Sequence, residues 1–298
     1  MLGVLRLERW LKSLESTRGE NMGMDIVDRM VDQMEHTNET TEFSPKDFAL
    51  PLKIGVDLGT SNIVITVLDN NNTPIAYALE SAHVVKDGIV VDFLAASKIV
   101  SRLKKQLETR LGVELIEAAT AIPPGIIYGN IKVIVNVVNA AGFNVIKVID
   151  EPEAAAIAMQ IKDGAVVDIG GGTTGVSMIR NGKVEYSIDE PTGGTHMTLV
   201  VAGNINTDFS EAERFKVEHK NHSQVFAMIH PVIEKMAHIT KTNLRGNVER
   251  LYLAGGASCL EGIEEVFSKY TGIQTCKPKN PLLITPIGIA ASIPSVRN

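Results

Sequence analysis

The chain has 298 residues, 44% of them hydrophobic and 21% charged, with a formal net charge of −6. This length suffices for two lobes with cores of their own, and the acidic balance argues against nucleic-acid binding. The two cysteines, Cys259 and Cys276, have neither a metal-type spacing nor the pattern of a disulfide framework. We expect buried free thiols in a reducing cytoplasm. No apolar run approaches the length of a membrane span, so we expect neither a transmembrane segment nor a secretory signal.

Residues 1–50 differ in pattern from the rest of the chain. An apolar stripe at helical spacing occupies residues 7–14 among basic side chains, a second occupies residues 26–34, and a polar run covers residues 36–42. This pattern predicts two short amphipathic helices and a linker. Three interpretations remain open: a helix packed on the body of the protein, a frayed leader, and a docking peptide for a shell or partner protein.

The first strand pattern lies at residues 53–68. An apolar run leads to Asp57, a turn of small and polar residues follows, and a second β-like run comes next. The turn consists of Gly59, Thr60, Ser61 and Asn62. Successive backbone N–H groups in such a turn form a concave anion site, and an aspartate beside it suits a hydrated magnesium ion.

Alternating strands and helices are predicted next. The expected strands cover residues 83–91, 116–122 and 145–149, and the expected helices cover residues 93–111 and 130–141. Gly112 and Gly142 would end the two helices, because glycine favours the helix C-cap. Pro152 suits the first turn of a further helix.

Residues 165–189 repeat the pattern of the first turn. An apolar run ends at Asp168, a turn follows, and an Asn-Gly pair separates two further β-like runs, which indicates a hairpin. The turn consists of Gly170, Gly171, Gly172, Thr173 and Thr174. Residues 170–175 also match the dinucleotide fingerprint, but that fingerprint must open a helix, and here a strand follows. A glycine-rich hairpin without a ligand remains the alternative.

The last third of the chain is predicted to be mostly helical. The expected helices cover residues 194–201, 211–216 and 223–244, before a strand at residues 250–254. Pro231 is expected to kink or start the longest helix. Ser258 and Glu261 suit a capping box, and a final short helix would begin near Pro286. Strands that alternate with helices and hairpins predict mixed sheets.

The two turns suggest a duplication. Asp57 and Asp168 are 111 positions apart, too far for a solenoid repeat, so each of two lobes would offer one hairpin to a shared cleft. Both hairpins resemble the two phosphate motifs of the actin-like ATPase superfamily, which includes actin, MreB, FtsA, DnaK-type chaperones and sugar kinases. Residues 150–156 resemble its first connecting motif, residues 253–258 its adenosine motif and residues 285–290 its second connecting motif.

This resemblance implies an α/β fold of the actin-like ATPase (ribonuclease H-like) type, with two lobes of mixed sheets, flanked by helices, around a nucleotide cleft. Lobe I would comprise residues 51–150 plus 284–298, and lobe II residues 151–283, after the extension at residues 1–50. Residues 85–93 and 190–196 carry a closer similarity, to the DnaK-like proteins of ethanolamine-utilisation operons. It implies a cytoplasmic location, in association with a bacterial microcompartment. Its implied partners are ethanolamine-utilisation enzymes or shell proteins, with self-association open.

The resemblance also implies roles for particular residues, with ATP or ADP and Mg²⁺ as cofactors. The residues assigned to catalysis are Glu151, Asp57, Asp168 and Thr173, and the same two aspartates would hold Mg²⁺ through water. The residues assigned to nucleotide binding are Gly59, Thr60, Ser61, Asn62, Gly170, Gly171, Gly172, Thr174, Glu213, Lys216, Gly255 and Gly256. Two alternatives stay open: Glu151 as a helix-N-terminal acid stabilised by the dipole, and Glu213 with Lys216 as an intrahelical ion pair.

Three functions compete on this basis. The first is a chaperone-like, slow Mg-dependent ATPase that assists an ethanolamine-utilisation system. The second is an MreB- or FtsA-like filament or scaffold protein, in which nucleotide controls assembly and turnover is small. The third, a small-molecule kinase, is disfavoured because Glu151 stands where a kinase needs an aspartate base, and because the first lobe has little room for a substrate-binding insertion.

Overall fold

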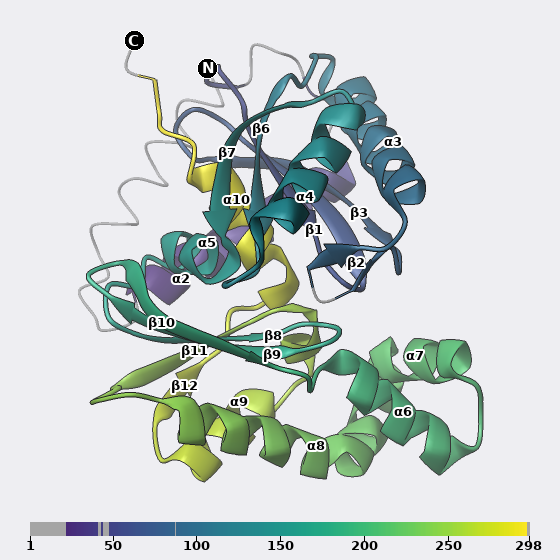
Figure 1. Cartoon of the computed structure of the whole chain (residues 1–298), viewed down its shortest axis with the longest axis vertical. Helices are drawn as coiled ribbons and strands as arrows, with labels where there is room; N and C mark the ends of the chain where they lie inside the picture. The colour runs from purple at the N-terminus through teal and green to yellow at the C-terminus, as the bar shows by residue number, and fades with distance from the viewer. Residues whose placement is uncertain (1–21, 41–42, 44–47, 87, 297–298) are drawn as a thin grey trace.

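The computed structural model describes residues 22–40, 43, 48–86 and 88–296. Two five-stranded sheets, each flanked by helices, lie one above the other in Figure 1. The strand orders are β3-β2-β1-β6-β7 and β10-β9-β8-β11-β12. In the first sheet the central strand β1 pairs antiparallel with β2 and parallel with β6. In the second sheet β8 pairs antiparallel with β9 and parallel with β11 in the same way. The expected duplication and mixed sheets are therefore confirmed.

The first sheet has its apolar core under two helices. Its strands are β1 (Lys53–Leu58), β2 (Asn62–Leu68), β3 (Pro74–Ser81), β6 (Glu117–Ile122) and β7 (Asn144–Asp150). The helices α3 (Phe93–Leu111) and α4 (Tyr128–Ala140) cover one face of it (Figure 1). The buried side of α3 includes Ile99, Leu103 and Leu107, which follow the helical period and contact the strands.

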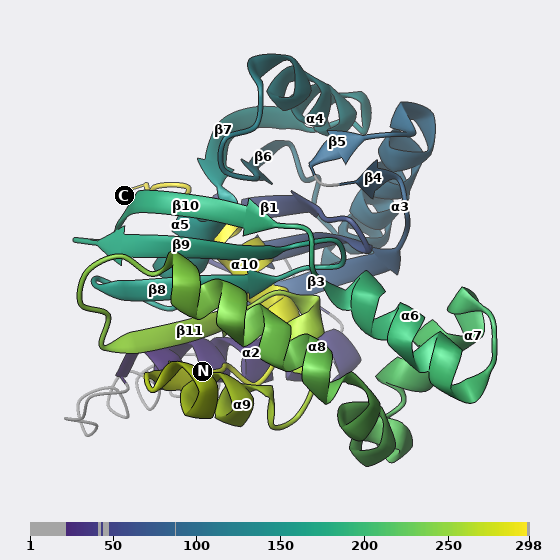
Figure 2. The same ribbon diagram turned by 60° about the horizontal axis from the view of Figure 1, so that its bottom comes forward.

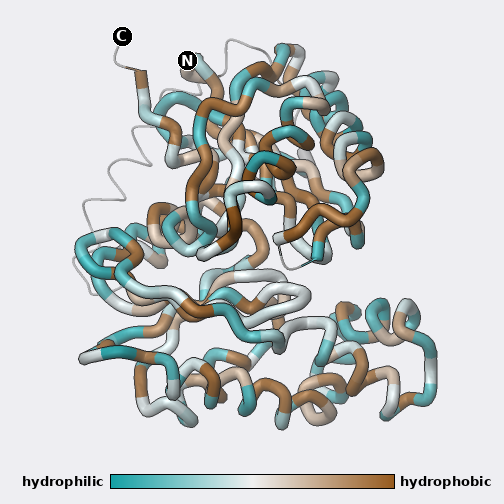
Figure 3. The backbone as a smooth tube through the Cα atoms, in the orientation of Figure 1, coloured by the Kyte–Doolittle hydropathy of each residue, from teal (hydrophilic) through white to brown (hydrophobic). Residues whose placement is uncertain are grey.

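The second sheet carries most of its helices on the outer face. Its strands are β8 (Gly164–Ile169), β9 (Thr174–Arg180), β10 (Lys183–Glu190), β11 (Arg250–Ala254) and β12 (Gln274–Cys276). Its helices are α6 (Gly194–Ile205), α7 (Phe209–Val217), α8 (His222–Asn243) and α9 (Ile263–Thr271). Figure 2 shows α8 and α9 across this face. Figure 3 shows hydrophobic and hydrophilic residues alternating along α8, whose apolar side meets the sheet.

Two short apolar helices cross between the sheets: α5 (Glu151–Ala158) and α10 (Ile284–Ala291). Their close packing is evident at Gly288, where an added Cβ would lie 1.8 Å from the carbonyl oxygen of Ala154. Helix α10 also touches the first sheet, where the Thr66 hydroxyl donates to the Pro286 carbonyl at 2.7 Å. The two connecting segments thus join the lobes at one crossing of small residues. The boundaries of the two lobes at residues 150/151 and 283/284 remain our proposal.

Helix α2 (Met22–Thr40) lies against β3, α5 and α10. It buries Val27, Val31 and Met34 completely. Its polar side binds the segment before α10, where the Lys279 backbone N–H donates to Asp28 at 2.8 Å and the Asn280 amide donates to Glu35 at 2.8 Å. The apolar stripe expected at residues 26–34 therefore forms a helix packed on the body, and the stripe at residues 7–14 lies outside the described residues.

Truncation of the buried side of α2 should destabilise the whole protein. Met34→Ala removes a fully buried side chain, and we expect a loss of about 2–4 kcal/mol in the free energy of unfolding. Urea titration followed by circular dichroism measures this loss. Asp25→Ala, on the exposed side of the same helix, should change the free energy by less than about 0.5 kcal/mol. Equal, small effects of both changes would show that α2 is an appendage.

Several local predictions were wrong. The strand expected at residues 83–91 is instead a small hairpin of β4 (Val85–Lys86) and β5 (Ile89–Val90), because Gly88 adopts a φ of +75°. The polar run expected to form a linker from residue 36 continues α2 to Thr40. Cys259 is exposed and Cys276 is half-buried, so neither is the buried thiol that was expected.

The capping box expected from Ser258 and Glu261 does not form. Ser258 lies in the short helix η3 (Gly256–Cys259), and its hydroxyl donates to the carbonyl of Ala254, the last residue of β11, at 2.7 Å. Helix α9 begins only after Gly262, whose φ is +83°. Within the described part of the chain, none of the helices has the length and apolarity needed to cross a membrane.

Candidate functional site

A cavity of about 690 Å³ lies between the two sheets. All the site residues expected from the sequence except Thr174 line it: Asp57, Gly59, Thr60, Ser61, Asn62, Glu151, Asp168, Gly170, Gly171, Gly172, Thr173, Glu213, Lys216, Gly255 and Gly256. Thr174 is fully buried in β9, and its hydroxyl donates to the Thr192 carbonyl at 2.5 Å. Its side chain therefore makes a structural contact and does not line the cavity, contrary to the expectation.

The first turn, between β1 and β2, projects from the first sheet into the cavity. Here the register pairs Leu58 with Ile63, which leaves Gly59 to Asn62 as the turn. The Ser61 carbonyl accepts a hydrogen bond from Ala82 N–H at 3.0 Å, and the Asn62 side chain accepts one from Ser81 at 2.9 Å. The turn is thus held by β3 and its continuation.

The second turn, between β8 and β9, is held by the start of α6. The N–H of Gly194 donates to the Gly170 carbonyl at 2.9 Å, and the N–H of Thr195 donates to the Gly171 carbonyl at 2.7 Å. A Cβ on Gly193 would come within 2.7 Å of the turn backbone, so this approach requires glycine. The two turns also contact each other: at Gly171 an added Cβ would lie 2.0 Å from the Ser61 hydroxyl oxygen.

Acidic side chains gather where the two turns meet. Burial, and to a lesser extent the charge of Asp168, raises the pKa of Asp57 to about 7. Burial and the charge of Asp189 raise the pKa of Asp168 to about 6, opposed by a hydrogen bond that the Thr285 hydroxyl donates at 3.5 Å. Burial, followed by the charges of Asp57 and Asp168, raises the pKa of Glu151 well above its usual range. Grouped acids removed from water resist ionisation.

These carboxyl groups fit a divalent cation. Within the described residues, none of Asp57, Asp168 and Glu151 forms an ion pair with a basic side chain. A cation among them would offset their mutual repulsion and the cost of burying their charge. Carboxylate oxygens beside an anion-binding turn are the donors that magnesium prefers. Among the described residues the oxygens of these three acids do not gather closely enough to ligate one ion together, so the donor set suits the Mg²⁺ held through water that the resemblance implies.

The far side of the cavity is formed by α7 and the turn after β11. Lys216 donates to Glu213 at 2.7 Å and to the Thr198 hydroxyl at 2.8 Å. The intrahelical ion pair that stood as the alternative is therefore present, and both residues also line the cavity. Gly255 has a φ of +84°, and a Cβ there would lie 2.2 Å from the Asp168 carboxylate oxygen. The turn after β11 can therefore reach the acidic residues only with glycine at this position.

Sequence reasoning missed several residues of the cavity wall. Asp189, Thr285, Arg214 and His222 line it together with the expected residues. Asp189 and Thr285 act on the pKa of Asp168, and Asp189 is the penultimate residue of its strand, as Asp57 and Asp168 are of theirs. This position near the end of a strand was the sequence signal that could have identified Asp189. Arg214 and His222 lie on helices whose sequence gives no sign of the cavity.

Known proteins resemble this chain in fold and in sequence. The MreB/Mbl protein family model matches residues 73–212, and the model of cell division protein FtsA matches residues 165–291. The crystal structure of MreB5 of Spiroplasma citri bound to ADP superposes with a TM-score of 0.62 at 17% identity, covering 80% of this chain and 94% of that one. The fold and the paired turns thus define the actin-like ATPase class.

Closer relatives give the family. Ethanolamine utilization protein EutJ of Escherichia coli K12 and that of Salmonella typhimurium LT2 are each 42% identical, over 81% of this chain and 86% of theirs. The crystal structure of EutJ from Carboxydothermus hydrogenoformans superposes with a TM-score of 0.84 at 44% identity, covering 90% of this chain and 98% of that one. The chain belongs to the EutJ family of ethanolamine utilization proteins.

Proposed function

We propose that this protein is a nucleotide-binding, chaperone-like ATPase that assists an ethanolamine-utilisation system. The observation that supports this most is the single cavity in which two glycine turns, one from each sheet, meet around Asp57, Asp168 and Glu151. Backbone N–H groups of the turns would bind the phosphates of ATP or ADP. The MreB5 structure with ADP, and a second one with AMPPNP, support this use of the fold.

Each group of residues has a separate task in this proposal. Asp57 and Asp168 would hold Mg²⁺, which when bound supplies positive charge to the phosphate oxygens. Glu151 would orient a water molecule, and the Thr173 side chain would contact the phosphate end. Lys216 and Glu213 would bind the ribose, and the flat surface of Gly255 and Gly256 would support the base.

Nucleotide binding should release protons at mildly acidic pH. The pKa of Asp57 is raised to about 7, so at pH 6.5 much of this carboxyl is protonated, and Mg²⁺ binding must displace that proton. Calorimetric titration with MgADP in buffers of different ionisation enthalpy measures the release. We expect one nucleotide per chain, proton release at pH 6.5 and almost none at pH 8.5. Absence of MgADP and MgATP binding at both pH values would overturn the proposed function.

Loss of the Glu151 carboxylate should slow hydrolysis while leaving binding intact. In Glu151→Gln we expect turnover to fall roughly 10²–10⁴-fold, because a positioned base contributes about that much. Single-turnover hydrolysis of radiolabelled ATP gives the rate, and AMPPNP titration gives the affinity. If Glu151 is only a helix-N-terminal acid, hydrolysis will be unchanged.

The matches to MreB/Mbl and FtsA favour a second candidate, a filament or scaffold protein whose assembly is controlled by nucleotide. Sedimentation with ATP, ADP and no nucleotide distinguishes the two. ATP-dependent pelleting with little phosphate release indicates the filament. A soluble protein that hydrolyses ATP and binds ethanolamine-utilisation enzymes or shell proteins indicates the chaperone-like role. For either role we propose a cytoplasmic location beside a bacterial microcompartment.

A further inference from the structure

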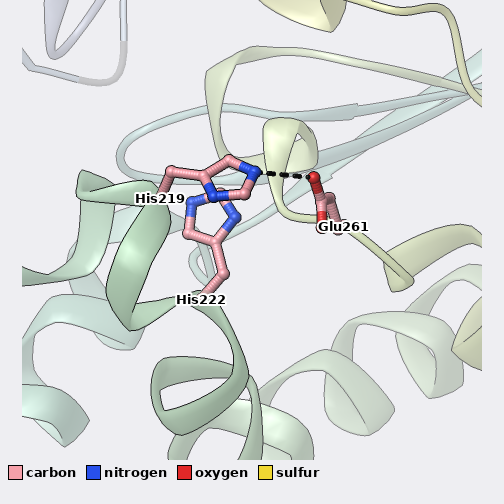
Figure 4. A group of neighbouring side chains, drawn as sticks. All are labelled: His219, His222 and Glu261. Carbon is pink, nitrogen blue, oxygen red and sulfur yellow. Dashed lines mark hydrogen bonds and ion pairs between the residues drawn. The ribbon is translucent and has the colours of Figure 1, made fainter.

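Two imidazoles and a carboxylate come together at the side of the cavity that is formed by α7 and the turn after β11. They are His219 in η2 (His219–Asn221), His222 at the start of α8, and Glu261 between η3 and α9. One ligand atom from each lies within 4.8 Å of the other two, and Figure 4 shows the three side chains gathered in one place. Across the described ranges of the chain, this is the one group of histidine, cysteine or carboxylate side chains so arranged.

The spacing within this group is close to that of a metal site. The Nε2 atom of His219 lies 3.2 Å from a carboxylate oxygen of Glu261. Two ligand atoms of a tetrahedral zinc ion, with bonds of about 2.0–2.1 Å, are about 3.4 Å apart. The rings of His219 and His222 stack with centroids 4.9 Å apart at an angle of 29°. The two rings must turn out of this stack for a nitrogen of each to bind one ion, and all three ligand atoms are close enough for that, since they lie within 4.8 Å of one another.

An ordinary surface ion pair explains only part of the arrangement. The side chains of His219 and Glu261 are 82% and 69% exposed, so their contact alone contributes little to stability. His222 is different, because its Nδ1 atom is buried and has no hydrogen-bond partner among the described residues. A buried polar atom without a partner is unfavourable, and such an atom in a native structure calls for a ligand, an ion or a water molecule.

We propose that His219, His222 and Glu261 form a binding site for a divalent transition-metal ion, Zn²⁺ by the chemistry of its donors. Imidazole nitrogens suit zinc, whereas magnesium and calcium prefer oxygen donors alone. Three protein ligands leave a fourth position for water. The exposed His219 and Glu261 give the ion access from solvent. This site is separate from the Mg²⁺ expected at Asp57 and Asp168.

The proposed zinc site joins two elements that border the cavity. His222 lines the cavity at the start of α8, and Glu261 follows the segment from Gly255 to Leu260, most of whose residues also line it. A metal bond between them would limit their separate movement, so zinc and nucleotide should influence each other's affinity equally. This coupling rests on the proposed nucleotide function, and the metal site itself does not.

Zinc titration of the metal-free, full-length protein tests the site. By calorimetry we expect one Zn²⁺ per chain, bound at least about tenfold more weakly by His222→Ala and by Glu261→Gln. His230→Ala, on the same helix α8 but outside this group, is the matched control and should bind like the wild type. Substitution with Co²⁺ should give visible absorption in the wild type that His222→Ala lacks.

Other results would overturn the site. Unchanged zinc affinity in His222→Ala, with folding verified by circular dichroism, would remove the histidine from the metal. A loss of zinc in Cys259→Ser with none in His222→Ala would assign binding to the exposed thiol. These titrations contain no nucleotide, so a failure of MgADP binding would leave their outcome unaffected.

Discussion

Asp57→Asn is expected to make the nucleotide-free protein more stable at pH 8 while eliminating Mg-dependent nucleotide binding. Folding raises the pKa of this carboxyl from its ordinary value near 3.8 to about 7. Such a group stabilises the folded state fully only at low pH, and stability is lost as the pH rises from about 4 to 7. The asparagine removes this loss, so we expect a gain of roughly 2–4 kcal/mol at pH 8.

Thermal melts of both proteins between pH 4.5 and pH 8.5 measure this effect. The difference between the two proteins should shrink as the pH falls from 7 toward 3.8, the ordinary pKa of this carboxyl in the unfolded chain. Asp163→Asn changes an exposed acid outside the cavity and should leave the pH profile as it is in the wild type. A variant that is less stable than the wild type at pH 8 would mean that Asp57 ionises there at no cost.

Gly288→Ala is expected to destabilise the protein by at least about 3 kcal/mol, a large effect for the addition of one methyl group. The new Cβ would lie 1.8 Å from the Ala154 carbonyl oxygen and 2.4 Å from its carbon. Backbone atoms cannot move aside as the end of a flexible side chain does, so α5 and α10 must separate. Denaturant unfolding measures the loss, and nucleotide affinity should fall with it because α5 begins at Glu151.

Gly203→Ala provides the matched control for this change. Gly203 also lies within a helix, α6, but a Cβ there would have no atom within 4 Å. Alanine should stabilise that helix by about 0.5–1 kcal/mol, because it is the better helix former. If both alanine variants were equally stable, the close contact between α5 and α10 would have no energetic consequence.

Much of the fold could be predicted because local chemistry decides it. The helix expected at residues 93–111 forms with those bounds, since Asp92 accepts from Ala95 N–H at its start and Gly112 ends it at a φ of +66°. The strand expected at residues 250–254 also forms as predicted. The two aspartates at strand ends pointed to the cavity, because each is placed there by its own hairpin.

The remaining features depend on contacts between distant segments. Ser258 has the sequence of a cap, but its hydroxyl donates to Ala254 at the end of β11, and Gly262 stands at the N-cap of α9. Thr285 reaches Asp168 only because α10 crosses between the sheets. Arg214 and His222 reach the cavity through the placement of α7 and α8. Contacts between such distant segments cannot be predicted from a pattern within a short stretch of sequence.

The position of α2 has a consequence for synthesis of the protein. Its apolar side shares a cluster with Leu283, Ile284 and Ile287, and Asp32 binds Lys279, 247 positions later in the chain. At roughly 5–20 residues per second, a ribosome needs about 10–50 s to make the residues in between. During that interval the methionines and valines of α2 lack part of their final covering. During synthesis the apolar side of α2 is therefore exposed to aggregation until the segment around α10 has been made.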